Sequence, residues 1–258
     1  MQIITLTTDF GGRDPYVGII KGVILNIFPY GKIVDITHEI SPQDVLETSW
    51  VLESSFFYFP KGTIHVCIVD PGVGSNRKPL LLETKDYFFV GPDNGVFSGI
   101  LEKEKDLKAF VLDKEQFWLS TNVSRTFHGR DVFSPVSAHL AKGIKTSDLG
   151  SKIEITNLVK LYENQFSKNQ KSCTGVVKHI DRFGNILTNI PHQDLPNKLN
   201  GKIKSFSFKG LLKNYSEGEP NKLYAITGSN GHLELFVNKG SAGKLTSAKV
   251  GDKIELQF

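Results

Sequence analysis

The chain has 258 residues, of which 39% are hydrophobic and 22% charged, and its formal net charge is +4. This composition is that of a globular protein and excludes a disordered chain. The lysines are scattered and no basic stripe alternates with aromatic residues, which argues against nucleic-acid binding. No apolar run reaches the ~18 residues of a membrane span, and Met1 leads directly into a predicted strand. We therefore expect no membrane segment and no signal peptide, with the cytoplasm as the default location.

The first part of the chain alternates strand and helix patterns. We expect strands at 2–8, 32–37, 63–69, 80–84 and 87–90, the last two as a hairpin, and helices at 15–28, 41–56, after 91–95 and at 131–142. In the second helix, Ser41 is the expected N-cap and Pro42 the first helical residue. This alternation predicts a layered α/β/α domain with a mostly parallel sheet over residues 1–157.

The pattern changes after a polar, aperiodic stretch at 158–172, which we interpret as a linker. Turns rich in Gly and Asn then separate short strands at 174–180, 186–190, 203–208, 223–227, 233–237 and 254–258. Such spacing is typical of a small all-β domain, barrel or sandwich, here over residues 173–258.

Two strings carry the clearest chemistry: V-D-P-G-V-G-S-N-R at 69–77 and F-H-G-R-D at 127–131. Asp70 follows a buried strand, at the strand end where open α/β sheets bind their ligands. The glycine-rich turn returns Arg77 toward Asp70, and His128 precedes an apolar helix. An Asp, an Arg and a His on loops at element ends form a candidate catalytic set. The alternative is an Asp–Arg ion pair that staples a loop beside a structural histidine.

Two further clusters suit a nucleoside with an amine. Asp9 and Asp14 flank a Gly-Gly turn, where one carboxylate can accept ribose hydroxyls and the other can hold an amine. Asp181 and Asn185 surround Phe183, which offers an aromatic face and an amide to a planar base. Each cluster is equally explained by local structure, as a helix cap in the first case and a β-turn in the second.

A metal site is the competing interpretation of the acidic residues. The possible ligands of a hard cation are Asp9, Asp14, Asp70, His128 and Asp131. No H-x-H or H-E-x-x-H pattern accompanies them, and Arg77 beside Asp70 would oppose a bound cation. We therefore expect no metal.

Seven strings, in order through nearly the whole chain, resemble one family. They are T-T-D-F-G-G-R-D, V-D-I-T-H-E-I, V-D-P-G-V-G-S-N-R, G-P-D-N-G, T-F-H-G-R-D-V-F-S-P-V-S-A-H-L, I-D-R-F-G-N-I-L-T-N-I and G-S-N-G-H-L. The chain resembles the S-adenosyl-L-methionine (SAM) hydroxide adenosyltransferases, or SAM hydrolases, which are related to fluorinase and chlorinase. The resemblance implies attack of water or hydroxide at the ribose C5′ of SAM, giving adenosine and L-methionine, with SAM as substrate and no cofactor.

The resemblance also assigns residues. The triad that uses water is Asp70, Arg77 and His128, and the halide-using relatives depart from it. We expect Asp70 to orient water and accept its proton, while Arg77 and His128 polarise that water. The implied substrate-binding residues are Asp9, Asp14, Phe127, Asp181, Phe183, Asn185, Tyr215, Ser229, Val237 and Lys239.

Within that set, Asp9 is assigned to the ribose hydroxyls, and Asp14, Asp181 and Ser229 to the amino-acid end. The remaining residues are assigned to the adenine. Gln43 and Asn230 stand where the fluorinase has a tryptophan and an arginine. The resemblance further implies a homotrimer whose sites combine one protomer's N-terminal domain with a neighbour's C-terminal domain.

Two other functions stay open from the sequence. A non-catalytic SAM or adenosine binder would hold SAM and leave it intact, although a pure binder has no use for a polarised water. A metal-dependent nucleoside hydrolase would lose its activity in EDTA.

Overall fold

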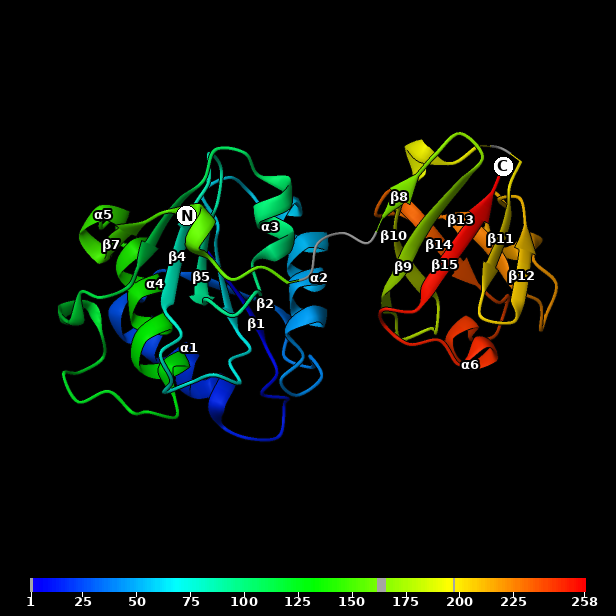
Figure 1. The fold of residues 1–258 in the computed structure, drawn as a ribbon. Coiled ribbons are helices and arrows are strands. Elements are labelled where there is room, and N and C mark those ends of the chain that lie inside the picture. Colours follow the sequence, from blue (N-terminus) through cyan, green and yellow to red (C-terminus); the bar gives the residue numbers. More distant parts are fainter. Residues whose placement is uncertain (1, 162–165, 197) are drawn as a thin grey trace. The chain divides into compact units, whose positions relative to one another are not determined.

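The computed structural model describes residues 2–161, 166–196 and 198–258. The chain divides into two compact units, Met1–Leu161 and Tyr162–Phe258 (Figure 1). In the described ranges no helix has the length and apolar character needed to cross a membrane.

A seven-stranded sheet in the order β2-β1-β3-β5-β4-β6-β7 forms the centre of the first unit. Its strands are β1 (Ile3–Thr8), β2 (Lys32–Thr37), β3 (Ile64–Ile68), β4 (Pro79–Glu83), β5 (Phe88–Pro92), β6 (Lys108–Val111) and β7 (Ser151–Ile153). The four strands β2, β1, β3 and β5 are parallel, whereas β4, β6 and β7 join antiparallel. The predicted α/β class is confirmed. Parallel pairing is confined to one half because a tight turn joins β4 to β5 as the predicted hairpin.

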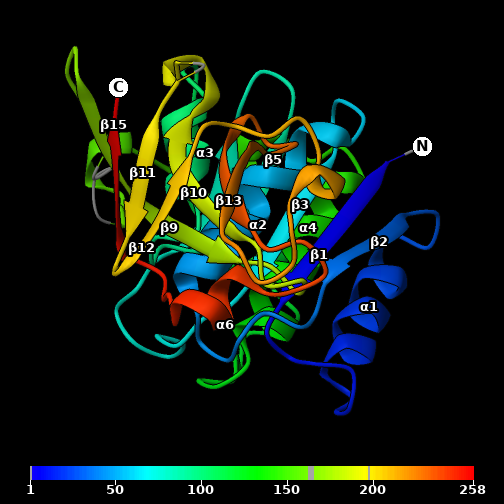
Figure 2. The ribbon, with the colours of Figure 1, turned by 90° about the vertical axis from the view of Figure 1, so that its right-hand side faces the viewer.

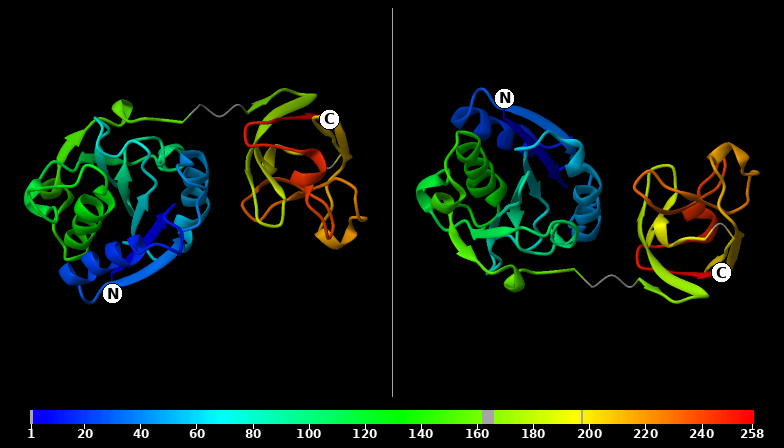
Figure 3. Two further views of the ribbon diagram at one scale, coloured as in Figure 1. Left: turned by 90° about the horizontal axis from the view of Figure 1, so that it is seen from below. Right: turned by 90° about the horizontal axis from the view of Figure 1, so that it is seen from above.

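Helices cover both faces of this sheet. They are α1 (Tyr16–Ile27), α2 (Val45–Ser55), α3 (Ser98–Lys103), α4 (Ser134–Ala141) and α5 (Thr146–Leu149). Helices α1 and α4 lie on one face and α2 and α3 on the other, as Figures 1 and 3 show. The pleat of β3 divides its side chains accordingly, since Val66 packs with the α1 and α4 core and Cys67 with the α2 and α3 core.

Helix α2 begins later than predicted, and its N-cap is Asp44, not Ser41. The Asp44 carboxylate accepts a hydrogen bond from the Glu47 backbone N–H at 2.9 Å. Gln43 has a φ of 67°, a left-handed conformation that cannot belong to the helix. Ser41 still takes part, because its N–H donates to the Glu47 carboxylate at 2.9 Å.

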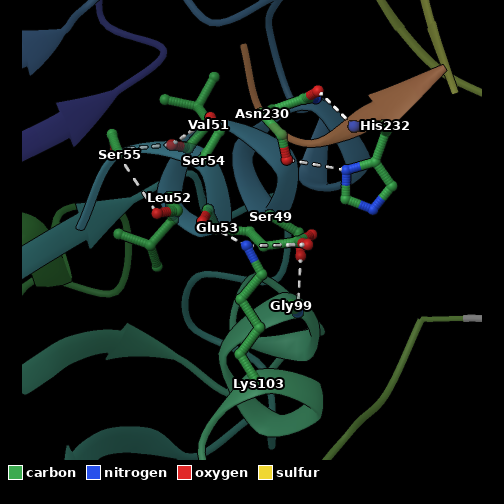
Figure 4. A network of polar contacts seen from close by, with 10 residues as sticks. All are labelled: Ser49, Val51, Leu52, Glu53, Ser54, Ser55, Gly99, Lys103, Asn230 and His232. Atoms are coloured by element: carbon green, nitrogen blue, oxygen red, sulfur yellow. Dashed lines mark hydrogen bonds and ion pairs between the residues drawn. The ribbon is translucent and has the colours of Figure 1, made fainter. Parts of the chain in front are cut away.

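Hydrogen bonds to α2 hold both ends of α3 (Figure 4). The Gly99 N–H donates to Ser49 Oγ at 3.2 Å, and the Lys103 ammonium donates to the Glu53 carbonyl at 3.1 Å. A side chain at Gly99 would collide with Glu53, whose Cβ lies 2.7 Å from the position of a Cβ at Gly99. The pair of helices is therefore packed too closely for any larger residue there.

The second unit is an antiparallel β domain, as predicted. Its strands are β8 (Ser167–Lys168), β9 (Ser172–Ile180), β10 (Ile186–Pro191), β11 (Asn200–Ile203), β12 (Phe206–Lys209), β13 (Tyr224–Thr227), β14 (His232–Phe236) and β15 (Lys253–Gln257). They follow the order β12-β11-β15-β9-β10-β14-β13, with β8 beside β9 (Figure 2). The strands curve around a shared core, closed at one end by α6 (Ala242–Thr246) (Figure 3).

One predicted strand of this unit is wrong. The run 203–208 is not a single strand: Ile203 ends β11, residues 204–205 form a turn, and residues 206–208 belong to β12. Lys204 has a φ of 52°, so the chain reverses there and Ile203 pairs with Phe206. Alternating apolar residues on both sides of the turn made the two strands resemble one.

His65 predicts acid sensitivity of the first unit. Its ring is fully buried, stacks on Phe89 and bonds Thr5 Oγ1 through Nδ1 at 2.8 Å. Burial lowers the pKa of His65 from 6.5 to about 3. Between pH 6.5 and about 3, His65 therefore binds a proton in the unfolded chain but not in the folded chain. The contribution of His65 to the free energy of unfolding should therefore fall by about 1.4 kcal/mol per pH unit between those two values.

Urea unfolding between pH 7 and 4 measures this slope. The His65→Gln variant should show a shallower slope than the parent chain. His192→Gln, at an exposed position, is the matched control and should leave the slope unchanged. Equal slopes for the parent and His65→Gln would show that His65 does not cause the acid sensitivity.

Candidate functional site

The loop after β3 brings Asp70 and Arg77 into a two-pronged ion pair. Arg77 Nε donates to Asp70 Oδ1 at 2.8 Å, and Arg77 Nη2 donates to Asp70 Oδ2. Each side chain is only 7% exposed. A glycine is required within the loop, since Gly74 has a φ of 77° and a Cβ there would lie 2.3 Å from the Arg125 carbonyl oxygen. The tight turn is what returns Arg77 to Asp70.

His128 completes the group through the same guanidinium. Arg77 Nη2 lies 2.8 Å from His128 Nδ1. A guanidinium only donates, so Nδ1 accepts and the ring proton of neutral His128 sits on Nε2. Burial and the Arg77 charge lower the pKa of His128 below its usual value, against the weaker opposing effects of Asp70 and Asp131. His128 is thus a neutral side chain that can donate from Nε2.

Three of the five N–H donors of Arg77 are committed to Asp70 and His128. Nε and both hydrogens of Nη2 serve Asp70 and His128, while Nη1 is buried with no hydrogen-bond partner among the described residues. Its guanidinium carbon also lies 5.2 Å from the centre of the Phe133 ring. Arg77 is therefore built into the wall behind Asp70 and His128.

A π-helical turn, η3 (Gly129–Phe133), places His128 at its N-terminus and runs directly into α4. The sequence predicted a plain helix from residue 131. Gly129 allows close approach to β3, because a Cβ there would lie 3.0 Å from Ile68 Cγ2. A π-turn inserts an extra residue into a helix and is common at functional sites. No periodicity in the sequence indicates it.

A cavity of about 470 Å³ opens beside this group. It is lined by Asp9, Phe10, Asp14, Tyr16, Gln43, Ile68, Asp70, Pro71, Val73, Thr126, Phe127, His128 and Gly129. Five predicted residues, Asp9, Asp14, Asp70, Phe127 and His128, are thus brought together, whereas Arg77 is not part of the lining.

Two aromatic residues of the lining were missed from the sequence. Phe10 and Tyr16 pack against Phe127, with ring centres 5.8 and 5.4 Å from it. Tyr16 is 45% exposed although it begins α1. Its position directly after Asp14 and Pro15 is the one sequence feature that places it near the predicted site.

Loops after neighbouring strands fix Asp9. The backbone N–H of Gln43 donates to Asp9 Oδ2 at 2.9 Å, and Gly11 N–H donates to the His38 carbonyl at 2.7 Å. The loop after β1 is therefore tied to the loop after β2, and Asp9 keeps a defined place in the cavity wall.

Asp131 has a structural role. It is 2% exposed and accepts hydrogen bonds from Ser124 N at 2.8 Å and from Arg130 Nη2 at 2.9 Å. In the described ranges no three His, Cys, Asp or Glu side chains meet as metal ligands. Of the five possible ligands, Asp70 and Asp131 are each paired with an arginine, which disfavours a cation at either carboxylate.

In the second unit, Asp181 and Phe183 line a smaller cavity of about 290 Å³ with Ile180, Arg182, Gly184, Ser241, Gly243 and Lys244. Asp181 Oδ1 accepts from the N–H groups of Phe183 and Asn185 at 2.9 and 2.8 Å. Asp181 thus closes the β-turn that the sequence offered as the structural alternative. Phe183 is 77% exposed, so its ring is available to a ligand.

Tyr215 is hydrogen-bonded to Glu234 in the second unit. Its hydroxyl donates to Glu234 Oε1 at 2.7 Å. Burial, the hydrogen bond to Glu234 and the charges of Glu234 and Asp181 raise the pKa of Tyr215 to about 12. Burial, together with Asp181, raises the pKa of Glu234, although the Tyr215 hydrogen bond opposes this. The sequence did not single out Glu234, which lies buried in β14.

The other predicted residues lie around β14. Val237 is buried and Lys239 is exposed with a φ of 54°. Ser229 is exposed in the turn before the strand. Beside it, Asn230 Oδ1 accepts from His232 N at 3.1 Å, and His232 Nδ1 donates to the Asn230 carbonyl at 3.0 Å (Figure 4). Asn230 therefore shapes this turn, whatever its relation to a ligand.

Comparison with known proteins gives one family. The family models for the SAM hydroxide adenosyltransferase N-terminal and C-terminal domains match residues 4–150 and 175–255. The (R)-S-adenosyl-L-methionine hydrolase of Methanocaldococcus jannaschii is 38% identical over 274 aligned residues, covering 100% of this chain and 97% of that protein.

Two further relatives extend the comparison. The fluorinase of Nocardia brasiliensis is 25% identical, covering 99% of this chain and 96% of that one. The crystal structure of an uncharacterized conserved protein from Thermotoga maritima superposes with a TM-score of 0.90 at 34% identity, covering 99% of each chain.

The ring protonation of His128 is directly measurable. At pH 7 we expect the neutral form with its proton on Nε2, because Nδ1 accepts from Arg77. Long-range ¹H–¹⁵N correlation spectra of histidine-labelled protein distinguish the two nitrogens. Arg77→Met should remove the preference, whereas a proton on Nδ1 in the parent protein would contradict the Arg77–His128 hydrogen bond.

Proposed function

The chain belongs to the SAM hydroxide adenosyltransferase family, and we propose that it hydrolyses (R)-S-adenosyl-L-methionine to adenosine and L-methionine. The observation that carries the proposal is the Asp70–Arg77–His128 group at the edge of a cavity lined by carboxylates and aromatic rings. The (R) configuration at sulfur is proposed by analogy with the 38% identical (R)-S-adenosyl-L-methionine hydrolase.

The proposed reaction is a single displacement at the ribose C5′. The oxygen of water forms a bond to C5′ while the C5′–S bond breaks and its electron pair moves to sulfur. The sulfonium leaves as a neutral thioether, so no general acid is needed. The proton lost by water passes to the enzyme and then to solvent. The enzyme must supply a positioned nucleophile and in-line geometry, and orientation of this kind contributes about 7–11 kcal/mol in favourable cases.

Asp70 is our choice for the residue that orients the water and accepts its proton, because it lines the cavity. His128 also lines it and donates from Nε2 to the oxygen. Arg77 holds both, and only its Nη1 is uncommitted. This changes the expected division of roles: Arg77 acts chiefly as a positioning residue rather than as a direct polariser of water.

The substrate contacts follow from the resemblance and stay predictions. Asp9 and Asp14 are proposed for the ribose hydroxyls and the amino-acid end, and both line the cavity of the first unit. Asp181 and Ser229 are proposed for the amino-acid end. Adenine is assigned to the set Phe127, Phe183, Asn185, Tyr215, Val237 and Lys239.

A homotrimer whose substrate-binding residues come from two protomers is proposed on the resemblance. A cytoplasmic location and the domain limits 1–157 and 173–258, joined by a linker, are proposed from the sequence patterns described above. The trimer is measurable by light scattering as a molar mass of three chains.

Oxygen labelling tests the reaction. In H₂¹⁸O with EDTA, we expect adenosine and methionine in equal amounts, with ¹⁸O in the 5′-hydroxyl of adenosine and none added to methionine. From SAM of mixed configuration at sulfur, the (R) form should disappear. Asp70→Asn should lower kcat by a factor of about 10²–10⁴, the range typical of a positioned base.

The matched control is Asp106→Asn, at an exposed position outside the cavity, which should keep full activity. Label in a methionine product would refute attack at C5′. SAM that binds but survives indicates the non-catalytic binder, and loss of activity in EDTA indicates the metal-dependent hydrolase.

A further inference from the structure

The segment G-P-D-N-G at 91–95 has no part in the chemistry proposed above. Its first two residues end β5, which pairs in parallel with β3. None of its residues lines the cavity. Its contacts nevertheless lead to the loop that carries Asp70 and Arg77.

Two consecutive residues hold the two ends of that loop. Asn94 Nδ2 donates to the Val69 carbonyl at 3.0 Å, immediately before Asp70. The Asp93 backbone N–H donates to the Lys78 carbonyl at 2.9 Å, immediately after Arg77. The loop 70–77 therefore begins and ends on Asp93 and Asn94.

Asn94 is itself held in place. Its Oδ1 accepts from the Val96 N–H at 3.3 Å, which leaves Nδ2 directed to Val69. Gly91 lets the end of β5 approach β3, since a Cβ there would lie 2.4 Å from the Cys67 carbonyl oxygen. Val69 is fully buried, so water cannot replace the donor if its carbonyl loses the bond to Asn94.

The Asp93 side chain serves a different segment. It is 6% exposed and its Oδ1 accepts from the Val159 N–H at 2.9 Å. Ser98 Oγ likewise accepts from the Leu161 N–H at 2.8 Å. These bonds anchor the last residues of the first unit, so the side chain of Asp93 and that of Asn94 have separable roles.

We propose that Asn94 is a positioning residue for Asp70: by holding the Val69 carbonyl it fixes the strand end from which Asp70 meets Arg77 and the cavity. Its kinetic consequence rests on the proposed function, whereas its effect on the loop does not. Loss of the Asn94 donor lets Asp70 and Arg77 move together, so their pair survives but its distance from a bound substrate is no longer fixed.

Asn94→Asp tests the proposal most directly. The shape and the acceptor for Val96 are kept, and only the donor to Val69 is lost. We expect kcat for SAM to fall roughly 10- to 100-fold, as for a small misplacement of a reacting group, with KM changed less than about twofold. Hydrogen–deuterium exchange of the 70–78 segment should become faster, while exchange in β1 and β4 stays as in the parent.

Asn26→Asp, the same exchange on the exposed face of α1, is the matched control and should change neither reading. Asn94→Ala repeats the test without an added charge, in case Asn94→Asp does not fold. Unchanged kcat and unchanged exchange in a folded variant would overturn the proposal, as would faster exchange throughout the sheet. If the parent protein forms no adenosine, the proposed function fails, and the exchange of the 70–78 segment alone decides the role of Asn94.

Discussion

One buried guanidinium organises the candidate site. Arg77 grips Asp70 with two donors and His128 with a third, so a carboxylate and an imidazole from distant parts of the chain share one reference point. Removing one partner of a buried ion pair leaves an uncompensated charge and costs about 3–5 kcal/mol. The same contact sets the protonation of the His128 ring. Arg77 donates to Nδ1, so Nδ1 must be unprotonated, and the charge of Arg77 disfavours a positively charged imidazole. The site depends on this contact more than on any single reactive side chain.

Several residues of the candidate site follow strands that end at one edge of the sheet. Asp9 follows β1, Gln43 lies in the segment after β2, Asp70 follows β3, and Asp93 and Asn94 follow β5. These are the four parallel strands, whose carboxyl ends meet at a common edge and form the usual ligand crevice of open α/β sheets. The lining residues 126–129, with His128 among them, come instead from the connection between the antiparallel strands β6 and β7.

Much of this arrangement could be predicted from the sequence, because it depends on local signals. Buried β-branched runs indicated the strands, and the glycines after Val69 indicated a turn that brings Arg77 back to Asp70. What could not be predicted depends on tertiary contacts. The cap of α2 moved to Asp44 because the Gln43 backbone turns left-handed to reach Asp9. Arg77 lies outside the cavity lining because its three hydrogen bonds to Asp70 and His128 hold it there. The pattern of residue types in the sequence does not indicate those hydrogen bonds.

The proposed mechanism requires Asp70 and His128 to act as one unit through Arg77. The most direct test is a double-mutant cycle on kcat for SAM hydrolysis with Asp70→Asn, His128→Gln and the combined variant. Residues that act as a unit are strongly non-additive, so the double variant should be scarcely slower than the slower single variant. If the two losses instead multiply, Asp70 and His128 act independently, and the shared guanidinium does not organise the reaction.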